Sequence, residues 1–449
     1  MKRLLSILSA CGWALALGGQ TWAVETNSAV PITSELVNRL LGEVRTNNPS
    51  LRSADATLRA ARLNASAVRI WDDPMVGFGG SIYSSRSFNP SEEGNLAYSV
   101  EQRLPLWGKP RLAKAVAEAD VGEKLAQADS RLRELRRDLI AALTDAALAE
   151  RLLELAEQDL SWLELISHSV EQRYRNGSAA LADTLQVQNE LAQRGNMLRA
   201  DRQHLAHYHL ALNRLLNRPV GASWPALRMP SVAPSVPYSA KLIALALAEE
   251  PRLKVQDWQI RQAAATAEAT RKNRLPDFSL GAEGRQFSDD GGFRSGMFTL
   301  RMSFPWFNRD KYRQDYQRDL ARKQAAEFQR EDLVQSVREE IHHVTVEIDN
   351  AHREILLYTG EIGVRADQAL SSRVADWETG RGMLREVLEA RRMLLEANTM
   401  AARAQAEQTR MMADLLLFTG LDSFEALVPL SQEAPLFSHD DEHAEHAHE

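Results

Sequence analysis

A unit that occurs twice constrains this chain more than any other feature: an alternating strand that leads, after a proline, into a very long helical stretch. In residues 298–304 apolar and polar side chains alternate up to Pro305, as in a strand with one apolar face, and no proline follows before Pro429. Residues 96–104 alternate in the same way and end at Pro105. Each strand is therefore predicted to lead directly into a long helix.

Two long helical hairpins are predicted, at about 110–217 and 310–418. The first helix has one glycine, Gly122, in about 65 residues, which corresponds to roughly 100 Å at 1.5 Å per residue. The second hairpin has soft points at Gly360 and Gly363. Such helices cannot be buried in a compact domain, so they must lie in a long bundle or tube. Apolar residues at spacings of three and four provide the packing seam: Leu132, Leu135, Leu139, Ala142, Ala146, Ala149 and Leu153.

Matching segments recur over the whole chain at nearly one offset, which indicates an internal duplication. Glu250-Pro251-Arg252-Leu253 repeats Asn48-Pro49-Ser50-Leu51 at an offset of 202, and Glu378-Thr379-Gly380 repeats Arg175-Asn176-Gly177 at an offset of 203. The predicted plan comprises a signal peptide (1–23), a first repeat (24–217, strands at about 75–104), a Pro-rich linker (218–240), a second repeat (241–420, strands at about 278–304) and a C-terminal segment with a His/acidic tail (421–449).

The N-terminus reads as a secretory signal. Lys2 and Arg3 precede an apolar stretch, and Ala23 ends a small-x-small cleavage site. Residues 8–11 also resemble a lipobox, in which Cys11 would be acylated, and this alternative stays open. Cys11 is the only cysteine, so an exported chain would contain no disulfide bond. These features suit the periplasm or the outer membrane of a Gram-negative cell.

Charge and motifs exclude several classes of function. The formal net charge is −7, and the body between signal and tail is close to balanced, so no basic face indicates a nucleic-acid partner. The sequence contains no phosphate loop, nucleophile elbow or zinc-hydrolase motif, so the chain is predicted not to be an enzyme and to depend on a partner for energy.

The strands are too few to close on themselves. Two hairpins give four strands, and four strands with an outward apolar face would leave open edges, which lipid does not tolerate. Three copies would give about twelve strands, within the range known for outer-membrane barrels. The alternative is a soluble coiled-coil protein with incidental hairpins, and alternation in all four strands speaks against it.

These features together resemble the TolC family of outer-membrane efflux channels over essentially the full mature length. Residues 102–109 and 303–309 are most similar to its cobalt–zinc–cadmium efflux branch. The resemblance implies a mainly α fold with a small β part, a homotrimer, a twelve-stranded barrel in outer-membrane lipid, a helical tunnel across the periplasm and an equatorial belt. It also implies two partners, a periplasmic adaptor and an inner-membrane resistance–nodulation–division pump. The resemblance rests on Asn48-Pro49-Ser50-Leu51, Asp73-Pro74, residues 173–177, residues 181–185 and their second-half counterparts.

The hairpin turns are the candidate docking sites for the adaptor. Asn176-Gly177 and Thr379-Gly380 provide glycines suited to left-handed helix caps, and this structural role is the simpler interpretation. Because the turns are predicted at the periplasmic tips, docking of the adaptor is an additional role.

Four residues near the tips are gate or lumen candidates. Asp183 and Glu386 occupy equivalent places just inside the return helices, where a carboxylate either stabilises the helix N-terminus or forms a charged ring in the lumen. In related channels an Asp at the Asp183 position contributes to links between protomers. Around the second tip this chain has Trp377 and Arg381-Gly382 where relatives have Tyr and Arg, so the linkage pattern of those relatives does not carry over directly to this chain.

The C-terminal tail mixes imidazoles with carboxylates, which suits weak binding of Zn²⁺, Co²⁺, Ni²⁺ or Cu²⁺ without a fixed geometry, and no cofactor is expected otherwise. A solvated disordered acidic tail is the alternative. In the segment His204-x-x-His207-x-His209, His204 and His207 could pair on one helix face, but no third ligand is in view, so these read as surface histidines. His342-His343 is a weaker candidate still. The tail ligands are His439, His443, His446 and His448.

The sequence thus predicts a passive outer-membrane duct for divalent heavy-metal cations. Export of organic drugs or type I secretion of proteins is the alternative within the class. A periplasmic adaptor or coiled-coil scaffold without a pore is the alternative of another class.

Overall fold

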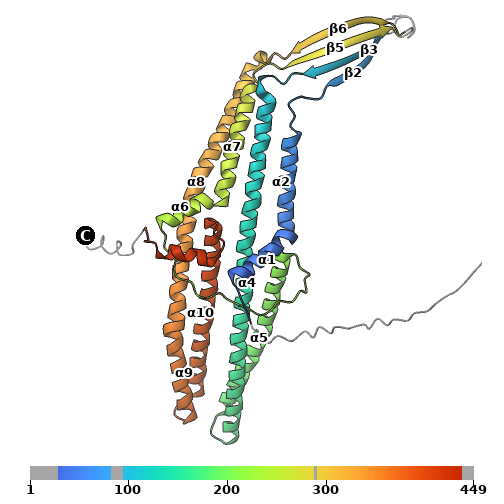
Figure 1. Cartoon of the computed structure of the whole chain (residues 1–449). Coiled ribbons are helices and arrows are strands. Elements are labelled where there is room, and N and C mark those ends of the chain that lie inside the picture. The colour runs from blue at the N-terminus through green and yellow to red at the C-terminus, as the bar shows by residue number, and fades with distance from the viewer. Residues whose placement is uncertain (1–28, 82–94, 288–290, 437–449) are drawn as a thin grey trace, which may run out of the picture.

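The computed structural model describes residues 29–81, 95–287 and 291–436 and shows an elongated protomer with a sheet at one end and two helical tips at the other (Figure 1). Short elements lie across the middle. The first repeat contains β1 (Val30–Pro31), α1 (Ser34–Asn47), α2 (Pro49–Ala67), β2 (Met75–Ser81), β3 (Asn95–Arg103), the 3-10 turn η1 (Leu106–Gly108), α4 (Lys109–Arg175) and α5 (Leu181–Leu216).

Among the described residues, none of the helices is apolar over a stretch long enough to span a membrane.

The second repeat has the same order of elements as the first, except that η3 interrupts its first long helix. The elements are β4 (Leu227–Arg228), α6 (Ala240–Glu249), α7 (Pro251–Lys272), β5 (Phe278–Phe287), β6 (Phe293–Met302), η2 (Pro305–Asn308), α8 (Arg309–Leu356), η3 (Leu357–Ile362), α9 (Gly363–Glu378), α10 (Leu384–Thr419) and η4 (Phe424–Gln432).

The element η3 is a π-helical turn between α8 and α9, and it contains Gly360 and precedes Gly363, where the sequence predicts soft points. A π turn widens the helix locally and is a common site of bending. The first long helix, α4, continues without such a break over 67 residues.

The starts of the short helices show why the repeats fold alike. The Asn48 side chain accepts a hydrogen bond from the Ser50 N–H (2.8 Å) at the start of α2. The Glu250 side chain accepts one from the Arg252 N–H (3.4 Å) at the start of α7, and a proline occupies the first turn of both helices. Equivalent caps at an offset of 202 thus begin equivalent helices.

The two β-hairpins join into one antiparallel sheet with the order β2-β3-β5-β6. Within it β3 pairs with β5 from Asn95↔Phe287 to Arg103↔Ser279, and the β5–β6 register shifts once, between Arg285 and Gln286. The inner pair therefore connects the two repeats, and β2 and β6 form the edges.

The apolar core lies in the middle of the protomer, where α1, α4, α8 and α10 pack together. Leu139 and Leu143 of α4, Ile341 and Ile348 of α8 and Leu415 of α10 are all completely buried. The Pro-rich linker is not entirely irregular, because Leu227–Arg228 pairs in parallel with Val30–Pro31. The strap, which we define as residues 226–234, thus ties the N-terminal segment to the core.

Candidate functional site

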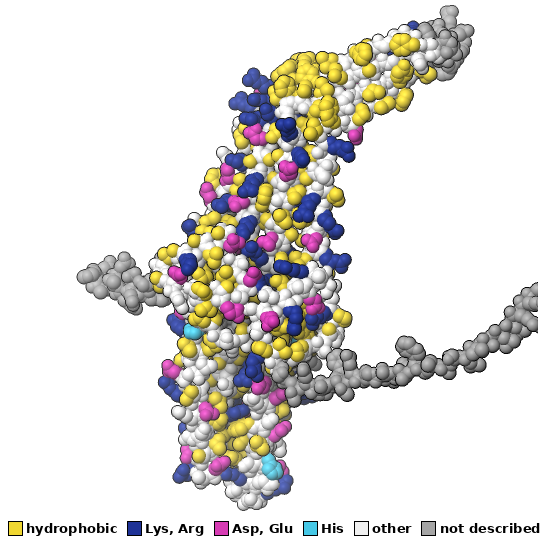
Figure 2. Space-filling view, in the orientation of Figure 1, with side chains coloured by type: hydrophobic (Ala, Val, Ile, Leu, Met, Phe, Trp, Pro, Cys, Tyr) yellow, Lys and Arg dark blue, Asp and Glu magenta, His cyan; other side chains and the backbone are white. Residues whose placement is uncertain are grey.

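The sheet has one strongly apolar face that is exposed in the protomer. The strand registers place Val76, Val100, Ala282 and Phe298 in one row across the four strands. Phe298 is 92% exposed and Phe78, on the same face, is 85% exposed. Hydrophobic side chains gather over the sheet, whereas charged side chains are scattered over the helices (Figure 2). A continuous apolar surface of this kind indicates an apolar environment around it.

The opposite face of the sheet is polar, and charges on it are paired both between strands and along one strand. The Ser279 hydroxyl donates to the Glu101 carboxylate (2.5 Å), which also pairs with Arg301. Glu283 and Arg285 form an ion pair of 2.8 Å on the same face. A sheet with one apolar and one polar face suits a wall between lipid and water.

The edges of the sheet are open. Strands β2 and β6 each have one strand neighbour, so the outer backbone groups of both strands have no strand partner in the described part of the chain. Open edges next to an apolar face favour pairing with another chain.

The two helical tips at the far end of the protomer are built alike. Gly177 has φ +72° and Gly380 has φ +77°, the left-handed conformation that glycine adopts without strain. The N–H of the following residue, Ser178 or Arg381, donates to the carbonyl five residues earlier (2.8 and 2.9 Å). Both turns are thus fixed and exposed. Docking of an adaptor there stays a prediction for Asn176, Gly177, Thr379 and Gly380.

Arg173 joins the first tip to the second. Its guanidinium donates to the Trp377 carbonyl (2.8 Å) and the Glu378 carbonyl (3.0 Å), at the C-terminal end of α9, where the helix dipole favours a cation. The same group lies 4.2 Å from the centre of the Trp377 ring. Trp377 is only 8% exposed, so the structure places this gate candidate between the two hairpins of one protomer.

The carboxylates Asp183 and Glu386 occupy the third residue of α5 and α10 respectively, where backbone N–H groups lack helical acceptors and favour negative charge. Glu386 also pairs with Arg373 of α9 (3.1 Å), and Arg381 pairs with Asp376 (3.5 Å). A charged ring in a lumen needs several copies of the chain, so the gate or lumen role of these residues stays a prediction.

The sequence analysis did not single out Asp159, which links three helices. Asp159 of α4 is 2% exposed and pairs with Arg391 of α10 (2.9 Å) and Arg194 of α5 (3.2 Å). One signal for it exists in the sequence, because Asp159 lies four residues from both Leu155 and Leu163, at a position where the helical spacing predicts an apolar residue. A carboxylate in an apolar seam indicates a buried ion pair.

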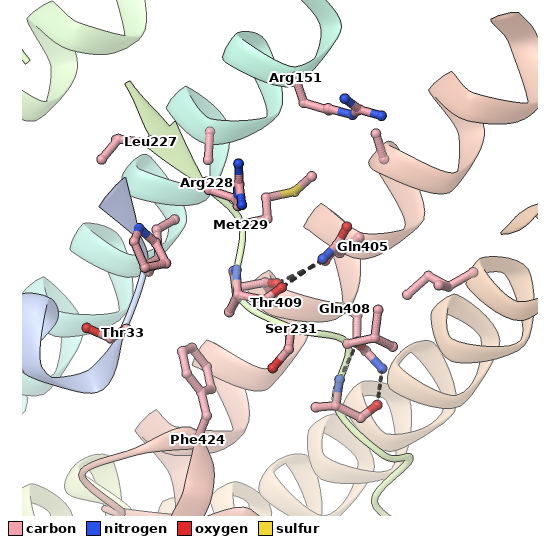
Figure 3. A pocket seen from close by; sticks show the side chains of 18 of the residues that line it. Thr33, Arg151, Leu227, Arg228, Met229, Ser231, Gln405, Gln408, Thr409 and Phe424 are labelled. Carbon is pink, nitrogen blue, oxygen red and sulfur yellow. Dashed lines mark hydrogen bonds between the residues drawn. The ribbon is translucent and has the colours of Figure 1, made fainter. Parts of the chain in front are cut away.

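A cavity of about 1450 Å³ lies between α4, α10 and the strap. Gln405 and Gln408 of α10 hold the strap through the carbonyls of Pro230 (2.7 Å) and Ala233 (2.8 Å) (Figure 3). Both apolar and charged side chains line the cavity, among them Met229 and Arg151. The side-chain amides of Gln405 and Gln408 thus bond to the backbone of the strap, and the cavity lies where the strap passes α4 and α10.

The described residues contain no group of three or more His, Cys, Asp or Glu side chains that could hold a metal ion. His204 and His207 are exposed on α5. His209 Nε2 lies 3.8 Å from Glu150 Oε1; burial lowers the pKa of His209 and raises the pKa of Glu150. The predicted tail ligands His439, His443, His446 and His448 lie outside the described residues.

Comparison with protein families gives a match to each repeat. The profile described as "Outer membrane efflux protein" matches residues 40–218 and 242–421. Comparison with curated proteins gives no match.

Several solved structures share the fold. The outer membrane protein VceC from Vibrio cholerae has a TM-score of 0.73 at 20% identity and covers 86% of this chain and 96% of its own. The CmeC outer membrane channel of Campylobacter jejuni (0.74, 14%) covers 97% and 98%, and CusC (0.75, 17%) covers 88% and 95%. The predicted fold class, a duplicated unit of long helical hairpins with a small sheet, is confirmed.

Proposed function

The chain belongs to the outer membrane efflux protein family, and from this premise we propose that it is the outer-membrane exit duct of a tripartite efflux system. The observation that carries the proposal is the sheet: an exposed apolar face, a polar face with paired charges, and two open edges. Lipid would cover the apolar face, and the polar face would line a water-filled lumen.

Three copies would complete the structure. Edge β6 of one copy would pair with edge β2 of the next, which gives about twelve strands and removes every open edge. The same copies would bring six helical hairpins side by side as a tunnel. Such a duct opens a path and supplies no energy.

Two partners follow from this arrangement. The tips lie at the end of the protomer opposite the sheet (Figure 1), so a periplasmic adaptor would meet them first. An inner-membrane resistance–nodulation–division pump would drive the transport. The support for these partners is family membership together with the fixed, exposed turns at Gly177 and Gly380.

The proposed cargo is divalent heavy-metal cations. Two features of the sequence support it: the similarity of residues 102–109 and 303–309 to the cobalt–zinc–cadmium branch, and the His-rich tail. Both are features of the chain itself and independent of each other.

The test is the tolerance of a cell that lacks this protein to zinc, cobalt, cadmium, nickel, copper and silver, with a panel of drugs alongside. Sensitivity to one or a few metals, restored by the intact gene, is the expected result. A gene truncated after residue 436 separates the tail from the channel. Sensitivity to drugs alone would overturn the metal assignment and leave the channel standing.

A further inference from the structure

We propose that neighbouring copies lock together where the sheet meets the helices, with Arg309 and Phe307 of one copy against Asp73 and Pro74 of the next. The contact would reproduce one that already exists inside the chain. The inference rests on the proposed trimer and names the residues that would hold it.

The internal contact lies between the end of β3 and the start of β5. The Trp107 indole N–H donates to the Pro276 carbonyl (2.8 Å). The Lys109 ammonium donates to the Leu275 carbonyl (2.8 Å) and the Asp277 carboxylate (2.7 Å). An aromatic ring and a cation of the first repeat thus clamp a Pro-containing segment of the second repeat, and the charged pair is half-buried.

The duplication provides a second copy of both halves of this clamp. Pro305, Phe307 and Arg309 stand at the positions of Pro105, Trp107 and Lys109 at an offset of 200. Arg309 is the first residue of α8, as Lys109 is of α4. On the other side, Asp73-Pro74 stands at the positions of Leu275-Pro276 at an offset of 202.

Strand order places these second halves at opposite edges of one chain. The internal clamp joins β3 to β5, which are neighbours in the order β2-β3-β5-β6. Its counterpart would join β6 to β2, the two edge strands. One chain cannot bring its own edges together with only four strands, so the β2 edge of a second copy has to supply Asp73 and Pro74.

The counterpart residues are exposed in the protomer, although the Phe307 ring lies edge-on to Phe304, with 6.4 Å between the ring centres. Phe307 is 90% exposed, whereas Trp107 is 47% exposed. Arg309 and Asp73 are both exposed, and the described residues contain no ion-pair partner for either. A cation at the first residue of a helix also opposes the helix dipole, so Arg309 would be stabilised by a carboxylate from outside.

The chemistry on the two edges is complementary, with three changes. Phe307 provides an aromatic ring but lacks the indole N–H by which Trp107 bonds to the Pro276 carbonyl. In the internal clamp the carboxylate, Asp277, follows the proline, whereas Asp73 precedes Pro74. The longer guanidinium of Arg309 replaces an ammonium and offers several donors, which suits both a carboxylate and the backbone carbonyl beside it. The pair therefore has opposite charges, and the Arg309 guanidinium supplies the hydrogen-bond donors of the contact.

Cross-linking tests the contact directly. In a Cys11→Ser background, the double variant Asp73→Cys/Arg309→Cys is treated with a short bismaleimide in membranes. Dimers and trimers that survive boiling in detergent are expected from the pair, and neither single variant should give trimers. The matched control, Lys109→Cys/Asp277→Cys, should form its cross-link within one chain, so it should migrate as a monomer in the denaturing gel. A long ion pair separates the Cα atoms too far for a direct disulfide, so a spacer is needed.

Charge reversal provides the second test. Arg309→Glu and Asp73→Arg should each reduce the heat-resistant trimer at least tenfold, and the double reversal should restore it to within twofold of wild type. Lys311→Glu, two residues further along α8 and also exposed, should leave the trimer unchanged.

The outcomes separate this inference from the proposed function. If wild type forms trimers but the cysteine pair does not link copies and Arg309→Glu is harmless, the clamp is wrong and the duct stands. If Arg309→Glu and Lys311→Glu weaken binding to phosphatidylglycerol vesicles equally and neither affects the trimer, these cations serve anionic lipid, which also overturns the clamp. If wild type forms no trimer, the proposed function itself fails.

Discussion

The sheet and the middle of the protomer are both rich in apolar residues, but these side chains are exposed in the sheet and buried in the middle. Phe298 and Phe78 in the sheet are 92% and 85% exposed, whereas Leu139 and Leu143 in the middle are completely buried. Burial of apolar area contributes about 25 cal/mol per Å², so the middle is stabilised within one chain by its own packing. The apolar face of the sheet is not buried within the protomer, so its stability depends on what surrounds it outside the chain. One chain therefore combines an apolar core that is buried within the protomer with an apolar sheet face that only an outside partner can cover.

The largest effect is expected from a charge in the buried middle. Leu143→Asp removes a fully buried side chain and leaves a carboxylate without partners, which should cost about 5 kcal/mol or more. Loss of helical circular dichroism and of protease resistance would measure it. Leu165→Asp is the matched control on the same helix, since Leu165 is 72% exposed and should retain the helical content. Equal losses from both variants would contradict the distinction between buried and exposed positions.

The next effect is expected where charge, rather than apolar packing, joins the hairpins. Asp159→Ala leaves Arg194 and Arg391 without their shared carboxylate and should lower stability by about 3 kcal/mol. Thermal unfolding in detergent and proteolysis near the tips would show it. In the control Glu154→Ala, an exposed pair with Arg151 is lost, which should cost at most about 0.5 kcal/mol. A loss of stability from Asp159→Ala no larger than that of the control would show that the buried carboxylate does not hold the hairpins together.

A charge on the apolar face of the sheet tests whether this face meets lipid, because the loss of stability should be large in a membrane and small in water. Phe298→Arg should destabilise the membrane-inserted form by about 2–4 kcal/mol. The helical content of the protein kept in water should hardly change, because Phe298 is already exposed. The folded fraction in outer-membrane extracts measures the effect, with Thr299→Arg on the opposite face as control. Normal insertion of Phe298→Arg would show that this face does not meet lipid.

The smallest effect is expected from an ion pair at the margin of the middle region. Arg218 donates to both Glu43 oxygens (2.7 and 2.6 Å), and this hydrogen bonding lowers the pKa of Glu43 below its ordinary value of 4.5. A lowered pKa in the folded state stabilises the fold above pH 4.5, and the contribution is lost as the pH falls through the lowered value.

Glu43→Gln should therefore cost about 1 kcal/mol at pH 7 and progressively less as the pH falls below 4.5, measured as the difference in unfolding temperature from wild type. The variant serves as its own control across the pH series. A difference that stays constant between pH 7 and pH 3 would show that the Glu43 charge does not contribute.

The sequence was a good guide wherever the signal is local. Alternation predicted a strand up to Phe304, and the structure has this strand as β6, which ends two residues earlier, at Met302. Helical spacing predicted the long helices, and the glycines at 177 and 380 predicted left-handed caps, which have φ +72° and +77°. Family membership and the fold class are confirmed. The metal branch, the docking role of the tips and the metal-binding tail stay predictions.

The sequence was a poor guide to contacts between the repeats. Arg173 lies in a motif that the sequence analysis quoted, yet its partner Trp377 lies 204 positions away, and no spacing rule connects them. Asp159 and Arg391 are separated by 232 positions, and only the packing of α4 on α10 brings them together. Partner choice over such distances depends on how helices pack.

The sequence by itself determined the alternating strands and the extent of the helices, because each depends on residues within a few positions of one another. It also determined the duplication, because matching segments recur at an offset of about 202 and can be compared without knowing the fold. Only the tertiary structure decided that β3 pairs with β5, that the gate candidate Trp377 is buried under Arg173, and that Phe307 and Arg309 stay open at one edge opposite Asp73 at the other. The physical reason is that pairing and burial are set by which surfaces meet in space. Two equivalent repeats in one chain join through one pair of strands, β3 and β5, and leave the edges β2 and β6 without a strand partner in the described part of the chain.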